Sequence, residues 1–134
     1  MSASEATELS PTSATADGTA LSAFDLFVAV EEGTVVGYLL AVRGDPTHVA
    51  EVVVEPDHRR QGYGAALFDR LFAAVAERRD DVTDPLVRLA VSPDDDGARS
   101  FYRSLGFEAS RRDPDYYDGA PALLLVRSVG DESA

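Results

Sequence analysis

A glycine-containing stretch near the middle of the chain is its most informative segment, and it reads Val52-Val53-Val54-Glu55-Pro56-Asp57-His58-Arg59-Arg60-Gln61-Gly62-Tyr63-Gly64-Ala65. The valine run is typical of a strand, and the apolar side chains that follow the stretch recur at helical spacing. A strand that runs through a glycine loop into a helix presents backbone N–H groups beside the positive end of the helix dipole. This arrangement predicts an anion site, best matched to phosphate, although Gly-x-Gly turns also occur without any ligand.

Composition restricts the partners and the chemistry. The chain has 134 residues and a net charge of −12, and all twelve of its basic residues are arginine. Such a charge disfavours nucleic acid and anionic membranes as partners, and we prefer adaptation to molar salt over an ordinary acidic protein. With no cysteine and two histidines, we expect no disulfide, no thiolate chemistry and no metal site. No signal peptide or membrane span is evident, so we expect a cytoplasmic protein.

The order of elements predicts one mixed domain of the α/β (α+β) class. Residues 1–20 are expected to form a mobile acidic tail, with a short helix near Glu5–Leu9, and residues 21–134 to form the domain. Leu86–Val91 is almost continuously apolar, which is typical of a central strand buried on both faces. Periodicity and turn residues predict, in chain order, strands Phe24–Val30, Thr34–Arg43 and His48–Glu55, helix Ala65–Arg79, strand Leu86–Val91, a helix that starts at Ser92-Pro93-Asp94 and ends at Gly106, and strands Phe107–Arg111 and Ala122–Arg127.

The second predicted helix carries another motif. Ala98, Phe101, Tyr102 and Leu105 follow one another at helical spacing, directly after an apolar strand. We interpret Phe101 and Leu105 as core residues. Tyr102 is the stronger functional candidate, because a buried tyrosine needs a partner for its hydroxyl.

Together the two motifs resemble those of the GNAT superfamily of acyl-CoA N-acyltransferases. Arg59-x-x-Gly62-x-Gly64 is similar to the pyrophosphate loop of that family, and Ala98–Phe107 is similar to its A-x-x-F-Y-x-x-x-G-F helix end. The resemblance implies the GNAT fold: a mixed, mostly antiparallel sheet with splayed central strands and helices on both faces. Here that fold would be shortened at the N-terminus, because the family's first strand and helix pair, which form much of the acceptor wall, are missing or reduced to the polar tail.

The resemblance also implies acetyl-CoA as the co-substrate and gives roles to individual residues. Tyr102 would protonate the departing thiolate, and Glu51 would act through water as the base for the amine, unless it is only a solvent-facing strand residue. Asp95 replaces the family's usual asparagine and brings negative charge near an anionic ligand, unless it caps the helix. The implied cofactor contacts come from strand backbone, loop amides and the second helix, at Val52, Val53, Val54, Arg59, Arg60, Gln61, Gly62, Tyr63, Gly64, Ala65, Asp95 and Ala98.

The acceptor is less well defined. Tyr116 and Tyr117, with Asp118-Gly119 after them, resemble a hairpin loop of the branch that acetylates protein N-termini, where the tyrosines contact the acceptor peptide. The alternative is a hairpin loop with two half-buried rings. We expect an N-acetyltransferase acting on a peptide N-terminus, with a small amine as acceptor or a catalytically idle acyl-CoA-binding domain as alternatives. A homodimer would cover the edge strands of so short a domain.

Overall fold

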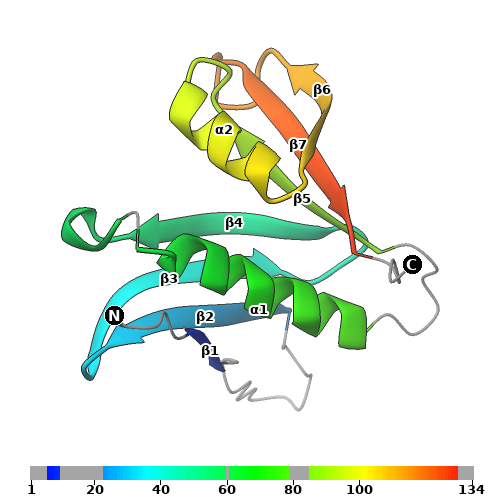
Figure 1. Ribbon diagram of the computed structural model, residues 1–134. Coiled ribbons are helices and arrows are strands. Elements are labelled where there is room, and N and C mark those ends of the chain that lie inside the picture. The colour runs from blue at the N-terminus through cyan, green and yellow to red at the C-terminus, as the bar shows by residue number, and fades with distance from the viewer. Residues whose placement is uncertain (1–5, 10–22, 60, 79–84, 130–134) are drawn as a thin grey trace.

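The computed structural model describes residues 6–9, 23–59, 61–78 and 85–129, which form a seven-stranded sheet and two α-helices (Figure 1). The helices are α1 (Tyr63–Glu77) and α2 (Asp96–Ser104), and a 3₁₀ turn (Pro56–His58) precedes α1. Within the described part of the chain, neither helix is long and apolar enough to cross a membrane. The strands are β1 (Ala6–Leu9), β2 (Phe24–Glu31), β3 (Thr34–Val42), β4 (Thr47–Val54), β5 (Leu86–Val91), β6 (Glu108–Asp113) and β7 (Ala122–Ser128).

The sheet is mixed and mostly antiparallel, as predicted. Its strand order is β1-β2-β3-β4-β5-β7-β6, and the single parallel pair among the described strands is β4 with β5. From Phe24 onward the predicted order of elements is confirmed, with ends that differ by a few residues. Helix α1 begins at Tyr63 rather than Ala65 because Gly62 serves as its N-cap.

The short helix predicted near Glu5–Leu9 was wrong. Ala6–Leu9 form strand β1, which pairs antiparallel with β2 from Ala6 opposite Ala29 to Leu9 opposite Leu26. A first strand is therefore present, and the mobile tail cannot include these four residues. The remainder of the predicted tail, residues 1–5 and 10–20, lies outside the described residues.

Both described helices pack on the same face of the sheet, whereas helices on both faces were predicted (Figure 1). Phe68 of α1 is fully buried in one core cluster with Leu39 of β3 and Leu89 of β5. The same ring contacts Phe101 and Tyr102 of α2, at centroid distances of 6.2 and 5.8 Å. A single core thus lies between one face of the sheet and the two helices, and no helix in the described ranges covers the opposite face.

The apolar sequence of β5 predicted a strand buried on both faces, and this prediction was wrong. Val87, Leu89 and Val91 are buried, and they alternate with three half-buried residues that include Arg88. Successive side chains of a strand point to opposite faces. Because the described helices cover one face only, β5 has one fully buried and one partly exposed side.

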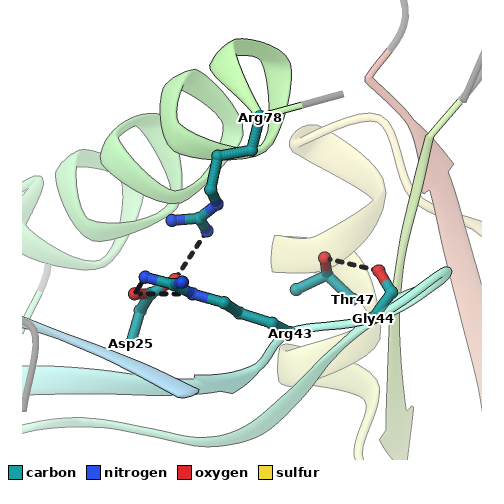
Figure 2. A network of polar contacts seen from close by, with 5 residues as sticks. All are labelled: Asp25, Arg43, Gly44, Thr47 and Arg78. Atoms are coloured by element: carbon teal, nitrogen blue, oxygen red, sulfur yellow. Dashed lines mark hydrogen bonds and ion pairs between the residues drawn. The ribbon is translucent and has the colours of Figure 1, made fainter. Parts of the chain in front are cut away.

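A buried carboxylate joins the sheet to the far end of α1 (Figure 2). The side chain of Asp25 on β2 is 1% exposed and accepts hydrogen bonds from two arginines. Arg43, which follows β3, donates from Nε and Nη2, and Arg78, the C-cap of α1, donates from Nη2. Charge-assisted bonds of this kind are stronger than neutral ones. They hold the C-terminal end of α1 against β2 and β3.

We expect Asp25→Asn to lower the free energy of unfolding by about 2 to 3 kcal/mol, because it leaves two guanidinium groups without their buried counter-charge. Urea denaturation of the two proteins measures this difference. Asp69→Asn on the exposed side of α1 is the matched control and should change stability by less than about 0.5 kcal/mol. Equal stability of the two variants would show that the carboxylate does not hold the helix.

Candidate active site

Strands β4 and β5 separate after a short contact. Within the described residues they pair at two positions, Thr47 with Val87 and His48 with Arg88. Beyond these positions the two strands diverge, and the sheet opens between them (Figure 1). The splayed central strands implied by the resemblance are therefore confirmed.

A β-bulge in β4 accompanies this separation. Leu40 of β3 pairs with Glu51, whereas Ala41 pairs with Val49, so Ala50 is the extra residue on β4. A bulge bends its strand and increases the local twist. The three valines that follow keep their pairing with β3 but have no partner on the β5 side, which leaves a strand edge facing the gap.

A cleft of about 670 Å³ opens at this gap. The end of β4, the glycine loop and the starts of both helices line it, and it brings together the predicted cofactor residues Val52, Val53, Val54, Arg59, Gly62, Tyr63, Gly64, Ala65, Asp95 and Ala98. Of the two remaining predicted residues, Arg60 lies outside the described residues. Gln61 does not line the cleft; it is exposed and donates from its Nε2 to the Asp57 carbonyl at 3.4 Å.

The start of α1 has the features of an anion site. Gly62, its N-cap, has φ of 89°, a left-handed conformation that glycine adopts without steric cost. The bond from the Ala66 N–H to the Gly62 carbonyl is the first of the helix, so the N–H groups of Gly64 and Ala65 come before it. No side chain caps this helix start. Its N–H groups and the positive end of the helix dipole therefore face the cleft, as phosphate binding requires.

Two residues of the loop have packing roles that the sequence did not reveal. A Cβ on Gly64 would lie 3.1 Å from Cζ of Phe101, so this glycine allows α2 to approach α1 closely. The ring of Tyr63 is buried, and its hydroxyl donates to Oε1 of Glu31 at 2.8 Å. The backbone of Tyr63 and Gly64 thus lines the cleft. The side chain of Tyr63 binds the loop to β2, and the missing side chain of Gly64 lets the loop pack against α2.

The side chains of Arg59 and His58 also differ from expectation. Nε of Arg59 donates to the Val54 carbonyl at 2.9 Å. This carbonyl, one of the strand-backbone groups predicted to contact the cofactor, therefore already has a hydrogen-bond donor. His58, to which the sequence analysis gave no role, also lines the cleft. Its ring nitrogens lie 3.4 Å from a Glu31 oxygen and 3.6 Å from a Glu55 oxygen. Its place inside the loop was the signal that could have identified it.

Asp95 both caps α2 and lines the cleft. Its Oδ1 accepts the Ala98 N–H at 3.0 Å, so the capping role considered for it is confirmed. The carboxylate nevertheless lies where an anionic ligand would bind. It also contributes, after burial, to raising the pKa of Tyr102.

Tyr102 is half-buried in the aromatic core beside the cleft. Its ring packs against Phe68, Phe101 and Phe107, at centroid distances of 5.3 to 5.9 Å. Burial, then Asp95, then Tyr117 raise the pKa of Tyr102 above its ordinary value. The phenol therefore carries its proton throughout the neutral range and can act as a donor.

The hairpin loop between β6 and β7 reaches Tyr102. Tyr117 and Ala120 close the turn by backbone hydrogen bonds, and Asp118 and Gly119 between them have positive φ, as in a type I′ turn. The rings of Tyr116 and Tyr117 meet edge to face at 5.0 Å and are 39% and 44% exposed. Because Tyr117 influences the pKa of Tyr102, the loop presents two exposed rings next to the predicted acid.

Glu51 lies on the face of the sheet that the described helices leave open. Its side chain is exposed, and it pairs across the sheet with Leu40. It interacts with Tyr38 of β3, a residue that sequence reasoning missed: burial and the Glu51 carboxylate raise the pKa of Tyr38. No local pattern marks Tyr38, since the register of β3 against β4 is what brings it to Glu51.

Splayed central strands, a phosphate-type helix start between them and a tyrosine on the next helix define the acyl-CoA-dependent acyltransferase class of fold. The chain belongs to the GNAT acetyltransferase family: its residues 22–109 match the model of the acetyltransferase (GNAT) domain.

Individual relatives differ in the acceptor that their names state. The chain is 35% identical over 97 residues to mycothiol acetyltransferase of Clavibacter michiganensis, which covers 72% of this chain and 28% of that protein. Its structure is similar to the ribosomal-protein-S18-alanine N-acetyltransferase of Escherichia coli, at 26% identity and a TM-score of 0.69, over 81% of this chain and 70% of that one. A GNAT family acetyltransferase of Elizabethkingia anophelis with acetyl-CoA bound shares the fold, at 14% identity and a TM-score of 0.72, over 93% and 97% of the two chains.

We expect Gly62→Ala to weaken acetyl-CoA binding by up to about tenfold, because a left-handed alanine costs about 1 to 2 kcal/mol and shifts the helix start. Calorimetric titration with acetyl-CoA measures the affinity. Gly119→Ala introduces the same strain, at a φ of 100° with no atom within 4 Å of the new Cβ. This control should lose stability but keep its affinity. If both variants bind acetyl-CoA as the wild type does, the loop is not the anion site.

Asp95→Asn separates the charge of this residue from its cap, since asparagine caps a helix as well as aspartate. We expect tighter acetyl-CoA binding and a lower pKa for Tyr102, because a nearby negative charge is removed. As the predicted acid, Tyr102 would act in its protonated form, so we expect activity to fall as pH rises through its pKa. The alkaline limb of the kcat profile should therefore move to lower pH.

Asp96→Asn is the matched control for Asp95→Asn, because Asp96 is exposed in the first turn of the same helix and does not line the cleft. Its acetyl-CoA affinity and its alkaline limb should equal those of the wild type. An alkaline limb that stays in place in Asp95→Asn would show that Tyr102 does not set it.

Proposed function

We propose that the chain transfers the acetyl group of acetyl-CoA to the primary amine at a polypeptide N-terminus. The observation that carries this proposal is one cleft lined by the end of β4 and the starts of both helices, together with Tyr102 on α2 and Tyr117, which interacts electrostatically with Tyr102. Each part matches one part of the reaction: phosphate binding, thiolate protonation and acceptor contact.

The residues of the cleft fit a nucleotide thioester. The backbone edge of Val52 and Val53 faces the gap and can bind an extended amide arm as an added strand would. The N–H groups at the start of α1 suit a pyrophosphate, with Arg59 and His58 at the same wall. Asp95 opposes this fit by its charge. In a chain with a net charge of −12, the binding of an anion rests on these few local donors.

When bound, acetyl-CoA supplies an acyl group that is already activated as a thioester. Glu51 takes the proton that the acceptor amine must lose, and the amine nitrogen then attacks the carbonyl carbon directly. Tyr102 gives its proton to the sulfur as the carbon–sulfur bond breaks. Because a thiol has a pKa near about 8.5, this help is modest and is worth a factor of about ten to a thousand. No covalent acyl-enzyme is needed, which agrees with a chain that has no cysteine.

A polypeptide acceptor is favoured by the open side of the site. The described helices leave the face that bears Glu51 uncovered, so a bulky acceptor can approach it. Tyr116 and Tyr117 stand exposed on the loop between β6 and β7, where their rings and hydroxyls can contact a peptide backbone. The net charge of −12 attracts the ammonium form of a peptide N-terminus.

A small amine is the second candidate. The similarity to mycothiol acetyltransferase, which covers 72% of the chain at 35% identity, supports it. The chain spans only 28% of that relative's length, however, so the similarity does not extend to the rest of that protein. The negative charge that attracts a peptide N-terminus would also attract a small cationic amine.

The first test is thermal unfolding in molar KCl, with and without acetyl-CoA and with a low-salt control. Binding at about a hundred times the dissociation constant should add about 2.7 kcal/mol, which is a shift of several degrees. Acetyl transfer is then compared among a peptide with a free N-terminus, the same peptide with a blocked N-terminus, and small amines. We expect transfer to the free peptide only.

Tyr102→Phe shows whether the domain is catalytic, since it should keep its acetyl-CoA affinity and transfer acetyl at least about tenfold more slowly. Transfer to small amines alone would favour the second candidate. Binding of acetyl-CoA without transfer to any amine would identify an acyl-CoA-binding module instead of an enzyme.

A further inference from the structure

Tyr38 and Glu51 lie on neighbouring strands and on the same face of the sheet. In the register of β3 against β4, Tyr38 pairs with Val53 and Leu40 pairs with Glu51. Directly paired residues of an antiparallel sheet share a face, so Tyr38 is the diagonal neighbour of Glu51. Diagonal neighbours are about 7 to 8 Å apart, a span that a tyrosine side chain can bridge. This is the face that α1 and α2 leave open.

The phenol and the carboxylate interact across this diagonal. Burial, then a hydrogen bond to Glu51, then the negative charge of Glu51 raise the pKa of Tyr38 above its ordinary value. The phenol is therefore protonated at neutral pH, and a carboxylate can only accept. Tyr38 is thus the donor of the pair and Glu51 the acceptor.

Glu51 has a particular place along β4. It is the first residue after the bulge at Ala50, where the strand bends and loses its contact with β5. A bulge re-aims the side chains beside it. An exposed glutamate samples many rotamers, and holding it in one of them costs conformational entropy that a fixed donor can offset. Tyr38 is such a donor, because strand β3 holds its backbone in place.

We propose that Tyr38 is a positioning residue that holds the Glu51 carboxylate at the gap between β4 and β5, where the acceptor amine loses its proton. The proposal rests on the proposed function. In the proton transfer the N–H bond of the ammonium breaks and an O–H bond forms on Glu51, directly or through one water. The nitrogen–carbon bond then forms, the carbon–sulfur bond breaks, and the thiolate takes the proton of Tyr102. The proton of Tyr38 stays on its own oxygen throughout.

A double-mutant cycle with Tyr38→Phe and Glu51→Gln tests this role. We expect Tyr38→Phe to lower kcat/KM for the acceptor about fivefold and to leave acetyl-CoA affinity unchanged. In the Glu51→Gln background the same substitution should change kcat/KM by less than about twofold, since the two residues act as one unit.

Phe24→Leu is the matched control, since Phe24 is another exposed ring on the same open face, at the far end of β2. Its kcat/KM should equal that of the wild type. If Tyr38→Phe slows transfer equally in both backgrounds, Tyr38 acts through packing and the proposal is wrong.

A titration separates this proposal from the proposed function. With tyrosine labelled by ¹³C at the ring carbon that bears oxygen, the Tyr38 signal is assigned by its loss in Tyr38→Phe. This signal should titrate at lower pH in Glu51→Gln than in the wild type, because the carboxylate raises the phenol pKa. The comparison needs no acceptor and holds even if no amine is acetylated. An unchanged titration would overturn the pairing by itself.

Discussion

The separation of β4 from β5 is the constraint on which the site depends. A sheet is stable when its strands keep their ladder, yet here the central parallel pair has only two paired positions among the described residues. The bulge at Ala50 bends β4 out of the ladder while its pairing with β3 continues. The unpaired edge at Val52 and Val53, the cleft beside it and the direction of Glu51 all follow from this one irregularity.

Helix α1 keeps the opened sheet together and supplies the anion site. Its buried face joins residues from both sides of the gap in one core, in which Phe68 lies with Leu39 of β3 and Leu89 of β5. Its first residue is held by the bond from the Tyr63 hydroxyl to Glu31, and its last turn by Arg78 bound to Asp25. Both ends are thus fixed to the strands β2 and β3. A helix held at both ends keeps its first N–H groups at the cleft, which is the condition for a preorganised phosphate site.

The chain and its proposed ligand, acetyl-CoA, are both negatively charged. Local hydrogen-bond donors at the cleft can offset this repulsion. A net charge of −12 disfavours any polyanion over the surface as a whole. At the cleft, the backbone N–H groups at the start of α1 and the Arg59 guanidinium provide local donors for an anion. Asp95 is the exception, since one carboxylate both starts α2 and lines the cleft. The same field that resists the cofactor favours a cationic acceptor on the open face.

Local patterns were enough for the order of the elements from Phe24 onward and for a glycine loop at a helix start that suits an anion, because a turn or a helix start depends on residues a few positions apart. The further cofactor residues around that loop came from the family resemblance, and the left-handed N-cap at Gly62 was found only in the structure. Tyr102 could be selected for the same reason, from its place in a helix that follows an apolar strand. The pairing of Tyr38 with Glu51, the approach of Tyr117 to Tyr102 and the contact of Gly64 with Phe101 could not be found in this way. Each joins segments far apart in the chain, and a shift of one residue in strand register would turn each strand side chain to the other face. The placement of both described helices on one face was also settled by tertiary packing, because an amphipathic helix shows which of its sides is buried but not which face of the sheet it covers.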